Sequence, residues 1–250
     1  VQVIAPKVEH TGDLATLWEA FSAACTDLGI AVVGGHTGRY AGCDWPMVGG
    51  ATCMAVGSED RYVTPKGASP GDRVVVTKGA AIEATALFGA TFGPRLSAAL
   101  DPDTVAAADH LFGAMTVVPE CRVAADYGLR DDGVTAMHDA TEGGVLGGLA
   151  EIAAASAVGL RIDRDRIPVK PEVAAVCDHV GIDPYVSISE GTLLATVRPA
   201  HADGFLEALA DAGVDVRAAA RHLHAEARVR PAAHRAAHRR RPLLRAPSSD

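Results

Sequence analysis

Residues 134–156 read VTAMHDATEGGVLGGLAEIAAAS, a short apolar run followed by a polar turn and a longer apolar stretch. Val134–His138 has the length of a buried strand, and Val145–Ser156 has the composition of a buried helix. The turn between them, Asp139–Gly144, carries two carboxylates, a hydroxyl and paired glycines. A strand that enters a helix through such a turn predicts an α/β fold with polar groups at the carboxyl end of the strand.

Alternating strands and helices are expected along the rest of the chain up to Val216. The apolar patterns predict strands over Ile30–Val33, Met47–Val56, Val74–Thr77, Leu160–Ile162 and Leu193–Val197, with another beginning at Tyr62–Val63. They predict helices over Thr11–Leu28, Ala80–Phe88, Thr104–Met115, Glu120–Tyr127, Pro171–Val180 and Ala200–Ala212. The turn-rich stretch Thr64–Asp72 separates two units, so we expect an N-terminal α/β domain over 1–68 and a second over 69–216.

Composition limits the class of protein. The chain has 250 residues, of which 48% are hydrophobic, and no apolar run approaches the roughly 18 to 20 residues of a membrane-spanning helix. The first residues do not resemble a signal peptide, so a soluble cytoplasmic protein with no membrane partner is expected. The five cysteines are scattered without a CxxC pair, which argues against a disulfide framework or a zinc cage and predicts buried thiols.

Charge is distributed unevenly. The net charge is -8, yet residues 217–250 hold nine Arg against two acidic residues, which leaves 14 basic and 29 acidic residues before them. This acidic body contains all four lysines of the chain and argues against nucleic acid as the main ligand. Residues 217–250 are expected to be a disordered basic tail. Three explanations stay open for this tail: a segment that binds nucleic acid or acidic surfaces, an inert solvated segment, or an out-of-frame end.

The segment Gly34-Gly35-His36-Thr37 is a candidate phosphate-binding turn. Paired glycines after a strand let the backbone approach a ligand, and their N–H groups suit an anion. Thr37 adds a hydroxyl, and His36 adds a donor that responds to pH. The spacing matches neither the Walker motif nor GxGxxG, so a tight turn with a satisfied histidine is the alternative.

The turn Asp139–Gly144 is the second candidate. Gly143 and Gly144 would offer N–H groups and the positive end of a helix dipole to phosphate. Asp139 and Glu142 could hold Mg²⁺, or one of them could accept a proton, with Thr141 beside them. The alternative is a helix cap in which Asp139 or Thr141 accepts from free amides.

Two further segments are candidates for the same cleft. Lys78 follows a predicted strand and precedes a glycine, so it either reaches an anion or is an ordinary surface lysine. Residues 187–192 precede the strand at Leu193 and either line the cleft or form a connecting turn.

Three ordered blocks resemble the AIR synthase-related (PurM-like) superfamily, closest to its archaeal HypE-type hydrogenase maturation members. They are DLGIAVVGGHT, GASPGDRVVVTKG and AMHDATEGGVLGGLAEIAAAS, the last continuing to IPV, GIDP and SEGTLL. The superfamily includes aminoimidazole ribonucleotide synthetase, selenophosphate synthetase and thiamine-monophosphate kinase. The resemblance covers residues 14 to 216.

This resemblance implies a two-domain α/β (α+β) protein that forms a homodimer and binds ATP and Mg²⁺. Members phosphorylate an amide or phosphate-ester oxygen, so the resemblance implies a small-molecule or carbamoyl-type substrate. Carried over by motif, Gly34–Thr37 and Lys78 would lie beside the nucleotide. Asp139, Thr141, Glu142, Gly143 and Gly144 would face substrate or phosphate.

The chain also departs from the family pattern. The Gly-Asp-Asp-type motif and the second aspartate motif that hold Mg²⁺ are not found, so the N-terminal domain is expected to be incomplete and the metal ligands are unknown. The C-terminal cysteine on which HypE proteins carry a carbamoyl group is also missing. The leading expectation is an ATP- and Mg²⁺-dependent phosphoryl-transfer enzyme. The alternatives are an inactive truncated homologue that serves as a binding module, a damaged gene product, and a Mg²⁺ phosphatase.

Overall fold

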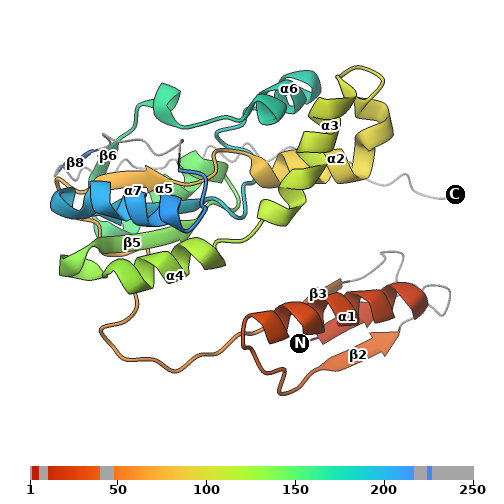
Figure 1. The fold of residues 1–250 in the computed structure, drawn as a ribbon, viewed down its shortest axis with the longest axis horizontal. Helices are drawn as coiled ribbons and strands as arrows, with labels where there is room; N and C mark the ends of the chain where they lie inside the picture. Colours follow the sequence, from red (N-terminus) through yellow and green to blue (C-terminus); the bar gives the residue numbers. More distant parts are fainter. Residues whose placement is uncertain (1, 6–10, 40–47, 217–223, 227–250) are drawn as a thin grey trace, which may run out of the picture. The chain divides into compact units, whose positions relative to one another are not determined.

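A computed structural model describes residues 2–5, 11–39, 48–216 and 224–226 of the chain. The chain divides into two compact units, unit 1 over Val1–Gly57 and unit 2 over Ser58–Asp250. Figure 1 gives the elements of each. None of the helices in the described ranges combines the length and apolar character that crossing a bilayer requires.

Unit 1 contains a three-stranded sheet and one helix. The strands are β1 (Gln2–Ala5), β2 (His36–Arg39) and β3 (Val48–Gly50), in the order β2-β1-β3. Strand β1 pairs parallel to β2 and antiparallel to β3. Helix α1 (Thr11–Asp27) ends where Gly29 adopts a positive φ of 71°, as its sequence predicts.

Two strand predictions in this part of the chain are wrong, and a third is too long. The expected strand Ile30–Val33 is irregular, and the strand begins instead at His36, because β1 pairs with residues 36–39. Residues Ile30–Val33 are exposed, and none of the strands in the described ranges pairs with them. Only Val48–Gly50 of the stretch Met47–Val56 is a described strand, and Tyr62–Val63, at the start of unit 2, is a loop.

Unit 2 is built on a five-stranded sheet with the order β5-β7-β4-β8-β6. Its strands are β4 (Arg73–Val76), β5 (Val134–Asp139), β6 (Gly159–Arg161), β7 (Leu193–Val197) and β8 (His224–Glu226). Strand β7 pairs antiparallel with both β4 and β5. Strands β4 and β5 therefore run in the same direction on either side of β7, and their carboxyl ends meet the start of β7 at one edge of the sheet.

Helices cover both faces of this sheet. Helix α5 (Gly144–Ser156) packs with Val74 and Val76 in one apolar cluster, whereas Val75 faces the opposite cluster. That second cluster contains residues of α4 (Val118–Tyr127) and α7 (Ala202–Asp211). The alternation along β4 follows from the two-residue period of a strand. Both faces of β4 are thus buried, and the α/β fold class predicted from the sequence is confirmed.

The remaining helices of unit 2 gather at one end of the sheet (Figure 1). They are α2 (Ile82–Leu96), α3 (Pro102–His110) and α6 (Pro171–Val180), with apolar clusters of their own. Each matches a predicted helix, although α2 continues beyond Phe88 to Leu96 and the expected helix Thr104–Met115 ends as a 3₁₀ turn after His110.

Two further sequence predictions need correction. Residues 217–250 were expected to lack structure, but His224–Glu226 forms strand β8, because the free edges of β4 and β6 both offer backbone groups to it. The other residues of the predicted tail lie outside the described ranges. The cysteines are free where described, and Cys25 and Cys177 are buried, but Cys53 is exposed.

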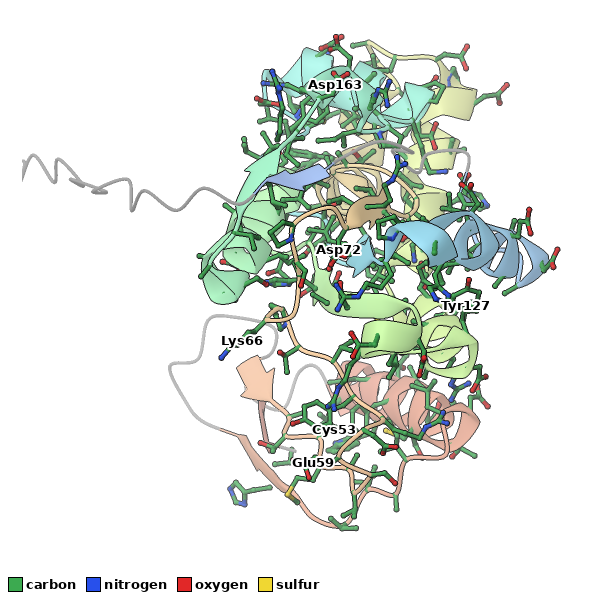
Figure 2. All side chains as sticks on the ribbon, turned by 90° about the vertical axis from the view of Figure 1, so that its left-hand side faces the viewer. Cys53, Glu59, Lys66, Asp72, Tyr127 and Asp163 are labelled. Atoms are coloured by element: carbon green, nitrogen blue, oxygen red, sulfur yellow. The ribbon has the colours of Figure 1, made fainter. Side chains whose placement is uncertain are left out.

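A buried carboxylate, Asp72, anchors the edge of the sheet at which β4 and β5 begin. One Asp72 oxygen accepts from the Ser69 N–H and from the Thr135 hydroxyl, both at 2.8 Å. The other lies 3.4 Å from the Arg198 guanidinium. Figure 2 labels Asp72 among the crowded side chains of unit 2. Because its side chain is 1% exposed, these partners replace water for the charge.

We expect Asp72→Ala to lower the free energy of unfolding of unit 2 by about 1–3 kcal/mol, because the Ser69 N–H and the buried Thr135 hydroxyl would lose an acceptor and Arg198 one of its two carboxylates. The matched control is Asp131→Ala, which removes the other carboxylate bound to Arg198 but is 92% exposed and should cost about 1 kcal/mol or less. Urea unfolding followed by far-UV circular dichroism tests this, because both tryptophans belong to unit 1. Equal losses in the two variants would contradict the assignment.

Candidate functional site

Polar groups converge at the edge of the unit 2 sheet where β4 and β5 end and β7 begins. The residues after β4 are Thr77, Lys78 and Gly79, and β5 ends at Asp139. Residues 189–192 lead into β7. This edge brings together three of the segments predicted from the sequence.

The turn Ser189–Thr192 ties the three strand ends to one another. The Thr192 hydroxyl donates to the Gly79 carbonyl at 2.7 Å, and the Thr192 carbonyl accepts from the Ala140 N–H at 3.0 Å. Ser189 donates its N–H to the Ala140 carbonyl at 3.0 Å. Since Ser189 and Thr192 are fully buried, these bonds satisfy groups that have no access to water. Residues 189–192 are therefore more than a connecting turn, because they hold the ends of β4 and β5 beside the start of β7.

Asp139 is held by this turn. Its Oδ1 accepts from the Gly191 N–H at 3.0 Å. Gly191 has a φ of 91°, and a Cβ there would lie 2.4 Å from the Ala114 carbonyl oxygen, so glycine is required. Burial raises the pKa of the Asp139 carboxyl, while the Gly191 N–H and the nearby Lys78 charge partly oppose the rise. The result is a half-buried carboxylate of increased basicity.

Lys78 belongs to a buried ion pair. Its Nζ lies 2.5 Å from Glu120 Oε1 and donates to the Thr116 carbonyl at 2.6 Å. The Glu120 side chain is 1% exposed and the Lys78 side chain 13% exposed. Lys78 is therefore not an ordinary surface lysine, and the ion pair with Glu120 holds its ammonium group in place. Its expected contact with a phosphate stays a prediction.

The turn Ala140–Gly143 opens helix α5 with backbone groups rather than with a side-chain cap. Gly143 is the N-cap residue with a φ of 81°, and no side chain caps the helix. The alternative of a cap by Asp139 or Thr141 is thus wrong, since Asp139 bonds to Gly191 instead. Thr141 is half-buried, and its carbonyl accepts from the Gly144 N–H at 3.0 Å.

Only part of this helix start is open to a ligand. Gly144 is buried, and a Cβ there would lie 2.5 Å from the Ser187 carbonyl oxygen. Glu142 and Gly143 are exposed, and in the described part of the chain their N–H groups have no hydrogen-bond acceptor. An incoming anion could use these two donors and the positive end of α5. The Gly144 N–H donates to the Thr141 carbonyl, and the predicted contact of Gly144 with phosphate stays a prediction.

In unit 1, the predicted motif lies where β2 begins. Gly34 and Gly35 precede the strand, and His36 and Thr37 are its first residues, so the glycines do not follow a strand as predicted. Residues 34–37 are exposed. Their predicted roles beside a nucleotide stay predictions.

Sequence reasoning missed two carboxylates of unit 2, Glu120 and Glu83, and included Glu190 only as part of the segment 187–192. Glu120 lies in the first turn of α4, where an acidic residue is ordinarily solvated, so nothing in the sequence signals its burial. Glu83 accepts from the Glu190 N–H at 2.9 Å. Burial and the charges of Glu83, Asp139 and Glu142 raise the pKa of the exposed Glu190 carboxyl. Glu83 and Glu190 therefore add negative charge to the same edge.

Residues 69–222 match the family model described as AIR synthase related protein, C-terminal domain. The chain belongs to the AIR synthase-related family. It is 31% identical over 202 residues to a protein of Rhizobium leguminosarum bv. viciae named carbamoyl dehydratase HypE, and 28% identical to the Cupriavidus necator protein of the same name. Each alignment covers 79% of this chain and 53% of the relative. The chain thus spans about half the length of these relatives.

Solved structures share the fold of this AIR synthase-related chain. The crystal structure of Escherichia coli HypE matches with a TM-score of 0.67 and 24% identity, over 84% of this chain and 61% of that one. A HypE structure in complex with ATP matches with a TM-score of 0.66 and 18% identity, over 90% and 63%. A thiamine-monophosphate kinase from Aquifex aeolicus matches with a TM-score of 0.55 and 17% identity, over 78% and 63%.

The residues at the sheet edge fit the phosphates of a nucleotide and part of a Mg²⁺ site. The free N–H groups of Glu142 and Gly143 suit phosphate oxygens. Asp139 and Glu142 provide carboxylate oxygens, the donors that Mg²⁺ prefers. The described residues contain no cluster of three or more such side chains able to hold a metal alone. Mg²⁺ would therefore need oxygens from the nucleotide itself, as is common for this ion.

We expect Lys78→Met to lower the free energy of unfolding by about 3–5 kcal/mol, because Glu120 would be left as an unpaired buried charge. Lys170→Met is the matched control, since Lys170 pairs with Asp215 at 2.6 Å in a more exposed position and should cost about 1 kcal/mol or less. Adding Glu120→Gln should recover part of the loss in the Lys78 variant. Urea unfolding measures all three, and equal effects of the two lysine variants would contradict the buried pair.

We expect Asp139→Asn to change how stability depends on pH. The folded chain binds the Asp139 proton more tightly than the unfolded chain does, so this group favours folding below pH 3.8 and loses that contribution as pH rises through the raised pKa. Asn cannot ionise, but its oxygen can still accept from Gly191. The unfolding free energy of the wild type, minus that of the variant, should therefore fall as pH rises. Urea unfolding over a pH series measures it, and a flat difference would refute the raised pKa.

Proposed function

We propose that this protein is an ATP- and Mg²⁺-dependent enzyme of the HypE type that removes water from a carbamoyl group. The observation that carries this proposal is the half-buried Asp139 carboxyl, fixed by Gly191 beside the open start of α5. The names of the relatives, carbamoyl dehydratase HypE, support the reaction class. The HypE structure in complex with ATP supports the nucleotide.

The chemistry requires a leaving group and a base. Loss of water from a carbamoyl group breaks its carbon–oxygen bond, removes two protons from nitrogen and leaves a nitrile. ATP would supply the phosphoryl group that makes the carbamoyl oxygen a good leaving group and would be released as ADP. The oxygen would then depart as phosphate, with one nitrogen proton passing to Asp139 and the other to the departing phosphate. We assign Asp139 as the proton acceptor, because a carboxylate whose pKa is raised by burial is a stronger base than one in water.

The other residues position phosphate and charge. The N–H groups of Glu142 and Gly143 would hold phosphate oxygens, and the Glu142 carboxylate would contribute to holding Mg²⁺, which would neutralise the charge of the phosphates. Thr141 lies between Asp139 and these donors and offers its hydroxyl to the substrate. Lys78, held by Glu120, keeps a positive charge near Asp139. Gly34, Gly35, His36 and Thr37 are proposed to contribute to nucleotide binding from unit 1.

The proposed enzyme acts in the cytoplasm as a homodimer. A carbamoyl-type small molecule or a carbamoylated protein segment is its substrate, and the acidic body argues against nucleic acid. A structural relative crystallised as a HypE–HypF complex supports a protein partner for this family, with a TM-score of 0.65 and 19% identity.

We expect ATP with Mg²⁺ to stabilise the chain. At a nucleotide concentration 100-fold above Kd, the gain is about 2.7 kcal/mol, which corresponds to a rise in Tm of roughly 5–10 °C. Glu142→Gln should reduce the Mg²⁺-dependent part of the rise, whereas Glu207→Gln, an exposed carboxylate of α7, should leave it unchanged. Thermal unfolding with and without Mg²⁺ measures it.

A variant of the same chain tests whether Asp139 is the base. Asp139→Asn should retain the ATP-dependent rise in Tm and lose the ATP-dependent dehydration of a peptide that carries S-carbamoylcysteine, followed by mass spectrometry. Absence of any ATP effect on Tm would overturn the nucleotide site. Full dehydration by Asp139→Asn would overturn the assignment of the base.

A further inference from the structure

A cationic cavity lies at the opposite edge of the unit 2 sheet. It has a volume of about 300 Å³, and its lining includes Tyr62, Thr64, Lys66, Arg130, Thr135 and Arg198. Thr135 is at the start of β5 and Arg198 directly follows β7, whereas Asp139 ends β5. At about 3.3 Å per residue, Thr135 and Asp139 are about 13 Å apart along the strand. The cavity is therefore distinct from the site proposed for ATP.

The three cations of this cavity differ in how they are neutralised. Arg198 is paired with Asp72 at 3.4 Å and with Asp131 at 2.8 Å. Arg130 donates to the carbonyl oxygens of Glu59 and Tyr62, which are neutral acceptors. The Lys66 ammonium group has no hydrogen bond or ion pair with any residue that the structure describes, and Figure 2 shows this side chain projecting from the ribbon. Two positive charges thus remain without a carboxylate.

Arg130 is fixed in place before any ligand binds. Its guanidinium bridges the carbonyls of Glu59 and Tyr62 at 2.5 and 3.3 Å and lies 5.2 Å from the centre of the Tyr62 ring. Both contacts restrict the side chain, which reduces the entropy lost on binding an anion. Its other nitrogens, Nε and Nη1, donate to no acceptor among the described residues.

The concentration of cations here is unusual for this chain. Residues 1–216 carry 14 basic and 29 acidic residues, and Lys66 is one of only four lysines. Asp72 and Asp131 lie beside Arg198 alone. The residues that line the cavity include three cations and no carboxylate. Such a lining attracts an anion.

We propose that this cavity binds a phosphate group carried by a small molecule. Arg130 presents a fork of N–H donors, Lys66 a mobile ammonium group and Tyr62 a hydroxyl, a set that can bind the oxygens of a tetrahedral dianion. The Thr64 hydroxyl donates to the Lys66 carbonyl at 3.2 Å and so shapes the backbone of the lining instead. The volume is at the lower end of the range for small-molecule sites. The proposal does not depend on the function proposed above.

Titration of the ¹⁵N-labelled full chain with inorganic phosphate, at ionic strength held constant with sodium chloride, tests the proposal. We expect saturable chemical-shift changes in the amides of residues 64–67 and Arg130. Lys66→Gln and Arg130→Gln should each raise the Kd roughly five- to tenfold, because each removes a charge-assisted hydrogen bond. Arg95→Gln, an exposed cation of α2, should leave the Kd unchanged and serves as the control.

The outcomes separate the two sites. Changes confined to residues 142–144 would overturn this proposal and leave the proposed ATP site intact. Equal Kd values for the wild type and both cavity variants would also overturn it. Acetate provides a second arm, because saturation by acetate with the same Kd would show that the cavity does not select phosphate. Lys66→Gln removes an exposed side chain without a partner, so its spectrum away from the cavity should match that of the wild type.

Discussion

The Thr192 hydroxyl donates to the Gly79 carbonyl, while the Thr192 carbonyl accepts from the Ala140 N–H. These bonds join the ends of β4 and β5 to the start of β7, and they are completely buried. Because β7 is antiparallel to both neighbours, any displacement of this turn would move two strand ends at once. The position of Asp139 depends on the same turn through the Gly191 N–H. A small hydrogen-bonded turn thus determines the geometry of the whole candidate site.

The burial of charged groups at that edge is unfavourable in itself, but it also changes the properties of the candidate site. Burying Lys78 and Glu120 removes both charges from water, and such a pair rarely stabilises a protein more than apolar residues would. The pair also affects Asp139, because the Lys78 charge limits the rise in the pKa of that carboxyl. Burial and charge therefore act in opposite directions on one group, which is typical of sites that transfer protons.

Polar groups occupy both edges of the sheet, but their charges differ. Carboxylates predominate at the first edge, where the charges of Glu83, Asp139 and Glu142 all act on Glu190. At the other edge, Arg130 and Lys66 lack a carboxylate partner among the described residues, and Asp72 neutralises only Arg198. The first edge therefore needs cations, such as Mg²⁺, before it can accept a polyphosphate. The second attracts an anion directly.

The sequence by itself determined most of the elements of unit 2, because apolar periodicity reports burial: β5, α5 and α6 lie where it predicted them. It did not predict β8. It singled out Asp139, Glu142 and Gly143, whose residue types and order are local features. It did not predict β1, and it placed the strand that follows α1 at Ile30–Val33, although β2 begins at His36, because a strand requires a partner and β1 pairs with residues 36–39. Only the tertiary structure decided that Glu120 captures Lys78 and that Gly191 holds Asp139. These contacts join residues 42 and 52 positions apart, and the energy of a buried charge depends on such distant neighbours rather than on its own sequence context.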